Sequence, residues 1–255
     1  MKISIVTVVY NCADTIQGCI ESVLGQDYDN VEYIVIDGGS KDGTVDVIKQ
    51  YESRIARFVS EKDKGIYDAM NKGLKLATGD VVGILNADDF FYSTDTLTKI
   101  AAAFTNKPEL DATIADIVFV NETNTRILRH YEAKKWRPAK FAWGYMPPHP
   151  SFFCKRRLFD KLGYYKTDYK IAADYELLIR YLYVNKIKYK YLPIITTRMR
   201  MGGVSTKNVN SILTLNKEIK RACAENHLGT NFLKIYTKYI FKPFEFVLNN
   251  QQNKS

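Results

Sequence analysis

The sequence predicts an α/β protein in which helices cover both faces of a mostly parallel sheet. Over the first 120 residues, short runs rich in valine and isoleucine alternate with segments of helical spacing, which is the order of repeated strand–helix–strand units. The runs are mostly apolar, as strands buried between two layers of helices are. We expect strands at Ile3–Val9, Val31–Asp37, Ile55–Ser60 and Val81–Leu85.

The rest of the chain departs from this alternation and predicts a second part packed on the first. Four prolines fall between residues 138 and 150, and helical patterns follow at about 156–162 and 172–185. No linker rich in serine and glycine separates the parts. We expect one domain over residues 1–205, made of a first half (1–120) and a second half (121–205), followed by a basic helical extension over residues 206–255.

The positive charge of the chain is concentrated near its C-terminus. The 255 residues carry a formal net charge of +9, and residues 181–255 hold 13 lysines and arginines against three glutamates. This segment therefore accounts for +10, while residues 1–180 carry −1. No recognisable nucleic-acid-binding module accompanies the basic segment, so we expect no nucleic-acid partner.

The cysteines and the N-terminus favour a reduced, cytoplasmic protein. Cys12, Cys19, Cys154 and Cys223 form no C-x-x-C pair and have no histidine cluster beside them, which argues against zinc and redox motifs. The apolar run that begins at Ile3 is too short for a signal peptide or a membrane span. We expect a cytoplasmic location, at the inner face of the plasma membrane if the basic segment binds lipid.

Polar clusters follow all four expected strands. Because ligands bind at the carboxyl ends of parallel strands, these clusters should line one functional edge of the sheet. The clusters are Tyr10–Asn11, Asp37–Gly43, Glu61–Gly65 and Asn86–Asp89.

Asp88 and Asp89 are adjacent carboxylates after an apolar run, where burial and mutual repulsion both make their charge unfavourable. A hard divalent cation such as Mg²⁺ or Mn²⁺ would compensate, because its usual ligands are one or two carboxylates together with substrate phosphates. The alternative is a turn or helix cap before Ser93 and Thr94. Paired acids directly after a buried run favour the metal site.

Asp37 ends the second expected strand and opens a glycine-rich loop. The backbone of residues 38–43 leaves room for a ligand to approach closely, and a carboxylate there can accept hydrogen bonds from a nucleobase or a ribose. A simple turn in which Asp37 caps the next helix explains the same residues nearly as well. The interpretation as a ligand site depends on the neighbouring clusters.

Four segments of the chain match one enzyme family in both order and spacing. They are Ser4–Asn11, Ile34–Thr44, Gly65–Gly73 and Leu85–Asp89. Together they resemble the family 2 glycosyltransferases, which have the GT-A fold, and the resemblance extends less strongly to about residue 205. It implies an enzyme of bacterial polysaccharide biosynthesis, with residues 1–120 binding a nucleotide-sugar and residues 121–205 on the acceptor side.

The resemblance implies donor-binding roles for residues at the first two strand ends. Thr7, Tyr10 and Asp37 are expected to hold the uridine of a UDP-sugar, with Asn11 beside them. Many family members also carry an arginine that reaches the nucleotide, and the matching position here is Met70. Lys72 is the nearest replacement cation, and a solvated helix lysine is an equally good interpretation of it.

The fourth strand end corresponds to the family's D-x-D metal motif. It reads Asn86-Ala87-Asp88 here, so the first aspartate is replaced. The resemblance implies that Asp88 holds a divalent metal, Mn²⁺ or Mg²⁺, that Asn86 contacts the ribose and that Asp89 assists nearby.

Asp174 matches the general base of the family, in a segment that opens an acceptor-side helix. The glutamate that commonly precedes this base is Ala173 here, and Glu176 is a competing carboxylate on another face of the helix. The alternative role for Asp174 is a cap of the helix over residues 175–185.

Several aromatic residues and one histidine precede this helix. His149 falls where related sequences place a histidine, so it is expected either to contact the donor phosphate or acceptor or to be structural. Trp136, Trp143 and Tyr145 are candidates for a sugar-stacking platform, although aromatic residues at this density are more often part of the core.

The implied reaction is an inverting displacement. Asp174 removes the proton of the acceptor hydroxyl, the oxygen attacks the anomeric carbon, and the metal neutralises the departing diphosphate. The main alternative is a binding protein or scaffold without turnover, for which the departures at Asn86, Met70 and Ala173 leave room. A nucleotidyltransferase is disfavoured, because no glycine-rich loop with arginine and lysine follows the first strand.

Two features near the C-terminus suggest further contacts. Arg198 and Arg200 precede a Met201–Ser205 stretch that could close over a diphosphate. The run Phe232–Lys242 alternates bulky apolar residues with lysines, as a helix on an anionic membrane does. A helix packed on the enzyme itself is the alternative. With the family resemblance, this run favours a lipid-linked or growing surface glycan as the acceptor.

Overall fold

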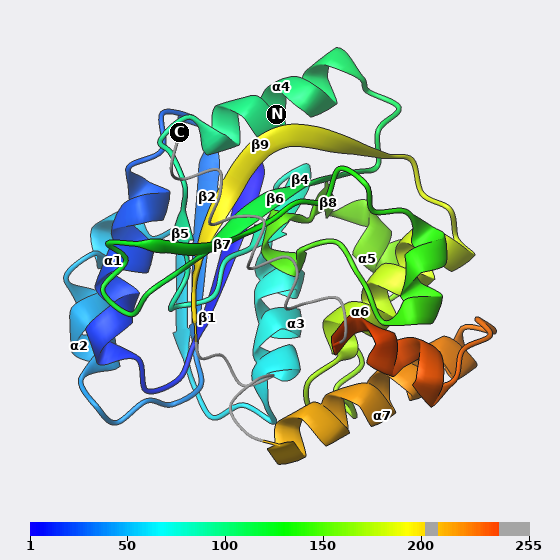
Figure 1. Ribbon diagram of the computed structural model, residues 1–255. Helices are drawn as coiled ribbons and strands as arrows, with labels where there is room; N and C mark the ends of the chain where they lie inside the picture. The colour runs from blue at the N-terminus through cyan, green and yellow to red at the C-terminus, as the bar shows by residue number, and fades with distance from the viewer. Residues whose placement is uncertain (202–208, 240–255) are drawn as a thin grey trace.

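The computed structural model describes residues 1–201 and 209–239, and a curved sheet lies at its centre (Figure 1). Within them the sheet has nine strands in the order β3-β2-β1-β4-β8-β6-β9-β5, and β7 pairs with β6. β1 to β4 run parallel, and β8 runs antiparallel to both β4 and β6. The predicted α/β class with a parallel first half is confirmed.

The first half of the chain largely alternates strands with helices, and longer connections appear in the second half. The strands are β1 (Ile3–Val9), β2 (Val31–Asp37), β3 (Arg57–Ser60), β4 (Val81–Ile84), β5 (Phe90–Phe91), β6 (Ala112–Val120), β7 (Ile127–Tyr131), β8 (Phe153–Lys155) and β9 (Tyr189–Arg200). The α-helices are α1 (Ala13–Leu24), α2 (Thr44–Lys49), α3 (Ile66–Leu76), α4 (Thr96–Asn106), α5 (Arg157–Leu162), α6 (Ala173–Leu178) and α7 (Val209–Glu225). A π-helix, Ile179–Val184, continues α6, and residues 232–239 are also helical.

The predicted strands of the first half are present, with small changes at two of their ends. β1 and β2 cover the predicted runs from first to last residue. β3 begins at Arg57 rather than Ile55, because Glu52–Arg54 form a 3₁₀ turn and Ile55 is buried after it. β4 ends one residue earlier than predicted.

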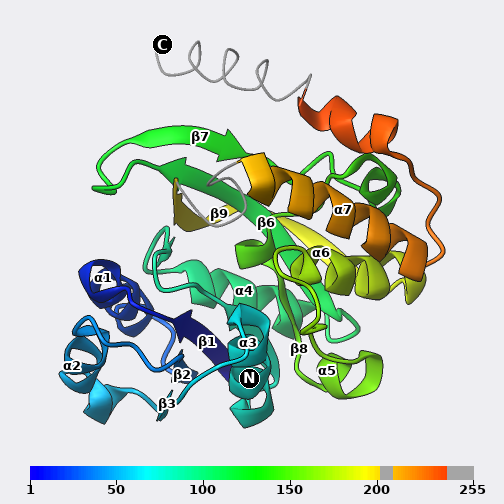
Figure 2. The same ribbon diagram turned by 90° about the horizontal axis from the view of Figure 1, so that it is seen from below.

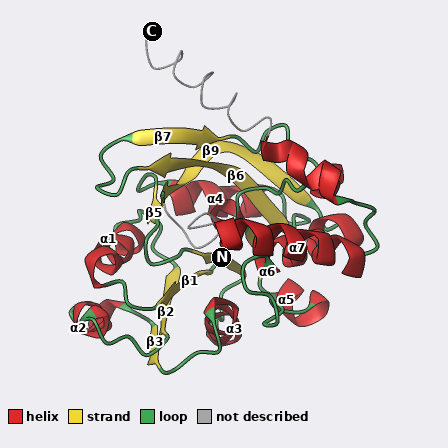
Figure 3. Ribbon diagram, turned by 60° about the horizontal axis from the view of Figure 1, so that its bottom comes forward, coloured by secondary structure: helices red, strands yellow, loops and turns green. Residues whose placement is uncertain are grey.

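Alternation along the strands sends side chains into two hydrophobic cores, one on each face of the sheet. Val6 and Val8 belong to the core with α3, α6 and α7, whereas Ile3 and Ile5 belong to the core with α1 and α4. Figure 3 shows α1 and α2 on one side of β1 and α3 on the other. A Cβ atom at Gly73 of α3 would lie 2.3 Å from Val6 Cγ1, so glycine permits this close approach.

The C-terminal extension shares the core of the domain that precedes it. Ile219, Ala222 and Cys223 of α7 are buried in the same cluster as α3 and α6, together with Ile235. α7 packs along α6, as Figure 2 shows. Residues 1–201 and 209–239 contain no helix with the length and apolar character that a bilayer span requires.

Candidate active site

The predicted polar clusters meet at the carboxyl edge of the parallel strands. β1 lies between β2 and β4, and the chain leaves β1 toward β2 first and reaches β4 later, so the sheet order reverses at β1. A crevice for ligands is expected at such a point. Hydrogen bonds join the loop after β1 to the loop after β2 at this edge. The Asn11 backbone N–H donates to Ser40 Oγ (2.8 Å), and Asn11 Oδ1 accepts from the Lys41 backbone N–H (3.0 Å).

The Asp37 carboxylate is buried and shapes its own loop. It accepts hydrogen bonds from the backbone N–H groups of Gly39 and Ser40 (both 3.1 Å), from Ser60 Oγ (2.6 Å) and from Ser40 Oγ. With its residue fully buried, it presents no surface to a ligand. Asp37 therefore supports the glycine-rich loop in this structure, and its uridine contact stays a prediction.

Thr7 also points into the protein. Its Oγ1 accepts a hydrogen bond from the Tyr33 hydroxyl (3.2 Å) and lies 3.7 Å from Cys19 Sγ of α1, and the residue is fully buried. Because side chains alternate along β1, Thr7 faces α1 rather than the ligand edge. The uridine contact expected of its side chain likewise stays a prediction.

Tyr10, Gly38 and Asp63 come together where a flat ring could bind. The Tyr10 side chain is 63% exposed, and a Cβ at Gly38 would lie 3.3 Å from Tyr10 Cδ2 and 3.0 Å from Asp63 Oδ2. The Asp63 side chain is only 10% exposed. Asp63 lies in the predicted cluster after β3 but was not singled out there, because four of that cluster's five residues are charged and nothing in the sequence distinguishes them.

Lys72 is held by three carboxylates in this part of the site. Its Nζ lies 2.5 Å from Asp63 Oδ1, 2.8 Å from Glu61 Oε1 and 3.7 Å from Asp68 Oδ2. The hydrogen bonds to Asp63 and Glu61 raise the pKa of Lys72 above its usual value, so it stays protonated. Met70, at the family's arginine position, is buried in the core.

The expected metal motif places oxygen atoms without partners beside Asp88. Asn86 Oδ1 and Asp89 Oδ2 are buried and have no hydrogen-bond partner among residues 1–201 and 209–239, while Asp88 is partly exposed. Burial, and then the charge of Asp88, raise the pKa of Asp89 well above its usual value. Carboxylate and amide oxygens next to one open carboxylate fit a hard divalent cation.

A metal at this place would need ligands from the substrate as well. No group of three or more histidine, cysteine, aspartate or glutamate side chains converges anywhere in the described part of the chain. Mg²⁺ and similar cations are commonly bound through one or two carboxylates plus substrate phosphates, so a small protein donor set is compatible with them.

Arg198 and Arg200 lie in β9 next to this motif. Arg198 lies opposite Phe90 in the pair formed by β5 and β9. Phe90 is the residue that directly follows Asp89 in the sequence. The guanidinium of Arg198 lies 4.9 Å from the Tyr92 ring centroid, and that of Arg200 lies 5.0 Å from the Phe90 ring centroid. β9 ends at Arg200, directly before the expected lid, and residues 202–205 of that lid lie outside the described residues.

Asp174 is the second residue of α6 and keeps part of its surface exposed. Its Oδ1 accepts the Tyr175 backbone N–H (2.7 Å), whereas the N-cap position is Ala172, which makes no side-chain cap. Burial raises the pKa of Asp174 to about 6. A carboxylate with this pKa is ionised at neutral pH and can still accept a proton, as a general base must.

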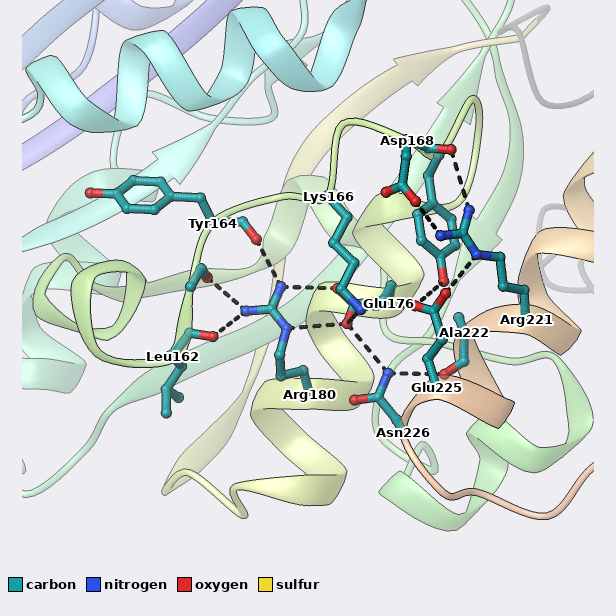
Figure 4. A network of polar contacts seen from close by, with 12 residues as sticks. Leu162, Tyr164, Lys166, Asp168, Glu176, Arg180, Arg221, Ala222, Glu225 and Asn226 are labelled. Carbon is teal, nitrogen blue, oxygen red and sulfur yellow. Dashed lines mark hydrogen bonds and ion pairs between the residues drawn. The ribbon is translucent and has the colours of Figure 1, made fainter.

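Glu176 lies on another face of the helix, as predicted. It is fully buried and pairs with Arg180 (Oε2 to Nη2, 2.9 Å) and Lys166 (Oε1 to Nζ, 3.1 Å) (Figure 4). Arg180 also donates to the carbonyls of Gly163 (2.7 Å) and Tyr164 (2.8 Å). The network fixes the loop before α6, which leaves Asp174 as the open carboxylate of this helix.

His149 and the tryptophans belong mainly to the interior. His149 Nε2 lies 2.6 Å from the Tyr165 hydroxyl, and burial lowers the pKa of this histidine to about 4, so it is neutral. Burial and neutrality favour the structural role of His149, and its contact with donor or acceptor stays a prediction. Trp136 packs edge-on against Phe141, while Trp143 is exposed, so the two do not form one platform.

The fold and the site together define a transferase of the GT-A class. Residues 4–171 match the family model described as Glycosyl transferase family 2. The PGL/p-HBAD biosynthesis glycosyltransferase of Mycobacterium tuberculosis is 28% identical over 239 residues, 92% of this chain and 89% of that protein. The Escherichia coli UDP-Glc:alpha-D-GlcNAc-diphosphoundecaprenol beta-1,3-glucosyltransferase WfaP is 27% identical over 232 residues, 88% of each chain.

Solved structures share the same fold. S. aureus TarS 1-349 in complex with UDP-GlcNAc has a TM-score of 0.68 at 20% identity, over 87% of this chain and 66% of that one. The mannosyltransferase PcManGT from Pyrobaculum calidifontis, in complex with GDP-Man and Mn2+, has a TM-score of 0.66 at 22% identity, over 96% and 68%. The chain spans 39% of a longer TarS chain. The protein belongs to the family 2 glycosyltransferases, of the bacterial polysaccharide-biosynthesis type.

Proposed function

We propose that this protein is an inverting, metal-dependent glycosyltransferase that moves a sugar from a UDP-sugar to an acceptor hydroxyl. The observation that carries the proposal is Asp174, a partly exposed carboxylate at a helix start whose pKa is raised to about 6. The UDP-GlcNAc complex of TarS and the UDP-Glc donor in the name of WfaP support a UDP-sugar.

The donor is bound along the carboxyl edge of β1, β2 and β4. The exposed Tyr10 ring stacks on the nucleobase, and Asp63, held by Lys72, accepts a hydrogen bond from a base N–H. Asn86 would contact the ribose, and Asp88 would hold the divalent cation, Mn²⁺ or Mg²⁺. When bound, this cation neutralises charge on the diphosphate.

Asp174 carries out the proton transfer of the reaction. It takes the proton of the acceptor hydroxyl while the acceptor oxygen forms a bond to the anomeric carbon, and the bond from that carbon to the diphosphate oxygen breaks. Attack from the face opposite the diphosphate inverts the anomeric configuration. A nucleoside diphosphate leaves without being protonated, so a second carboxyl group, as in glycoside hydrolases, is not needed.

Three residues differ from the family's pattern, but the proposed catalytic and metal-binding carboxylates are retained. Met70 and Ala173 are buried in the hydrophobic core, and Asn86 still offers an amide oxygen beside Asp88. These positions therefore differ from the family without removing the carboxylates at Asp88 and Asp174. This argues for turnover over the alternative of a degenerate scaffold.

We propose a lipid-linked glycan as the acceptor, reached from the surface of an anionic membrane. Phe232, Leu233 and Tyr236 are exposed on the helix at residues 232–239, with Leu233 at 79%. Lys220 Nζ lies 4.5 Å from the Phe232 ring centroid. Exposed apolar side chains next to lysines suit a lipid headgroup layer. Residues 240–242 of the predicted run lie outside the described residues.

The donor site is tested by calorimetric titration of UDP, GDP and dTDP, with and without Mn²⁺. UDP binding that requires the cation and is lost in Asp88→Ala supports the proposal. Asp95→Ala, which changes an exposed carboxylate paired with Lys99, is the matched control and should bind as the wild type does. If no nucleotide binds to the wild-type protein, the enzyme interpretation fails.

The membrane contact is tested by sedimentation with phosphatidylglycerol vesicles. Leu233→Glu should abolish binding, while Ile127→Glu, at an exposed residue on β7, should leave it unchanged. Equal binding of wild type and Leu233→Glu would overturn the membrane proposal without affecting the donor site.

A further inference from the structure

We propose that Glu218 of α7 is a positioning residue for transfer, because it holds the backbone that carries Asp174. The inference rests on the proposed role of Asp174 as the base. It concerns a residue of the C-terminal extension, beyond residues 4–171 that match the family model.

The Glu218 carboxylate accepts its hydrogen bonds from the backbone of the loop before α6. It accepts the backbone N–H of Lys170 at 2.7 Å and those of Ile171 and Ala172 at 2.9 Å each. The residue is only 9% exposed. Hydrogen bonds from three consecutive N–H groups to one ionised carboxylate are charge-assisted, so they fix the direction of the backbone at this point.

This loop determines where the base lies. Ala172 is the N-cap residue of α6, and Asp174 follows two residues later. A negative charge at the N-terminal end of α6 also stabilises the helix, which continues through Ile179–Val184. A shift of the three held N–H groups therefore moves Asp174 relative to the donor edge.

The same loop is attached to the donor half of the protein. The Tyr67 hydroxyl, from the first turn of α3, donates to the Ile171 carbonyl at 2.5 Å. Glu218 and Tyr67 thus hold the N–H and C=O sides of one segment from two different elements. α3 begins directly after the cluster that contains Asp63, so the base is positioned against the element that bounds the nucleotide site.

Glu218 also acts on Asp174 through its charge. The titratable groups that face Asp174 come from three elements: Tyr67 of α3, Tyr165 of the loop after α5 and Glu218 of α7. Burial raises the pKa values of both tyrosines, so they are neutral at pH 7. Burial also raises the pKa of Asp174, and the negative charge of Glu218 adds to that rise.

Glu225 supplies a matched control on the same helix. It binds Lys166 Nζ (2.8 Å), the Tyr169 hydroxyl (2.9 Å) and Arg221 Nε (2.6 Å) (Figure 4). It therefore holds an earlier part of the same loop but does not act on Asp174. A loss of stability alone should affect Glu225→Gln and Glu218→Gln alike.

The test compares Glu218→Gln, Glu218→Asp and Glu225→Gln in the full chain by kcat, donor KM, UDP affinity, pH profile and urea unfolding. Glu218→Gln should lower kcat about tenfold to a hundredfold, because small displacements of a catalytic group have effects of this size. UDP affinity should stay within about twofold, since the donor edge is not touched. The acidic limb of the pH profile should move to lower pH, because a charge that raises the pKa of Asp174 is gone.

Glu218→Asp keeps the charge but withdraws it by one methylene group, so kcat should fall while the acidic limb stays in place. Glu225→Gln should lose stability without either change. The proposal is overturned if Glu218→Gln keeps the wild-type kcat and pH profile, or if Glu225→Gln shifts the profile equally. Asp174→Asn distinguishes failure of the positioning role of Glu218 from failure of the proposed base. Transfer that survives in this variant rejects Asp174 as the base.

Discussion

Replacing Asp174 by asparagine should abolish transfer and at the same time stabilise the fold. The two effects have one cause, because the carboxylate proposed as the base is held where burial disfavours its charge. A helix-capping aspartate predicts no such gain, because asparagine caps a helix about as well as aspartate, while loss of a negative charge in the first turn costs about 0.3–1 kcal/mol. The variant therefore distinguishes the catalytic from the capping role.

The size of the stabilisation follows from the pKa of Asp174. Burial raises it from 3.8 to about 6, and a shift of this size corresponds to at most about 3 kcal/mol. Asp174 keeps part of its surface exposed, so solvent screening reduces the expected gain to about 1–2 kcal/mol. Asparagine can still accept the Tyr175 N–H, and only the charge is removed.

The difference in unfolding free energy between Asp174→Asn and the wild type depends on pH, and this dependence can be measured. A carboxylate whose pKa is higher in the folded state contributes stability at low pH that is lost as pH rises through about 6. Asp174→Asn should therefore exceed the wild type in urea unfolding at pH 7.5, and the difference should shrink between pH 6 and pH 4.

Transfer by the same variant should fall about 10²–10⁴-fold, as expected when a general base is lost. Wild-type kcat should also decline below about pH 6, where Asp174 becomes protonated. An asparagine variant that is less stable than the wild type at pH 7.5 would refute the reasoning, and so would an unchanged rate.

Three further predictions concern the sheet and the donor site. Gly73→Ala should destabilise the protein by about 1–3 kcal/mol in urea unfolding, because the new methyl group meets Val6; an unchanged midpoint would contradict this close contact. Lys72→Met should weaken UDP binding about tenfold in calorimetry, since Asp63 loses its ion pair, whereas Lys72→Arg should retain most of the affinity. Burial alone would raise the pKa of Glu32, but hydrogen bonds from Ser4, Thr78 and Lys2 lower it to about 2, so Glu32 contributes about 2–3 kcal/mol above pH 4.5 that disappears toward pH 2. Glu32→Gln should be less stable than the wild type at pH 7 and equal to it near pH 2; equal stability at both pH values would contradict the prediction.

Much of the first half of the fold can be predicted from the sequence, because its strands are long apolar runs with polar residues directly after them. The pattern places β1, β2 and β4 correctly and brings their following loops to one edge. The second half is harder to predict. The paired residues of β6 and β9 are 77 or more residues apart in the sequence, and nothing local to either strand specifies its partner.

The candidate site is only partly readable from the sequence, because the direction of each side chain depends on packing. Thr7 and Asp37 lie at the expected strand ends, yet Thr7 faces α1 and Asp37 turns back on its own loop. Asp174 is found by resemblance alone. Glu218 acts across 46 residues of sequence on backbone N–H groups, and such a contact leaves no motif in the chain.

The network around Glu176 limits how this enzyme can be cut or recombined. Arg180, Lys166 and Glu225 connect the loop before α6 to α7 (Figure 4). The boundary of the recognisable family segment is therefore not a folding boundary. A chimaera that exchanges residues 1–171 between relatives will pair the foreign residue at position 166 with the Glu176 and Glu225 of the recipient chain. The exchanged segment should therefore be transplanted together with a matching α7.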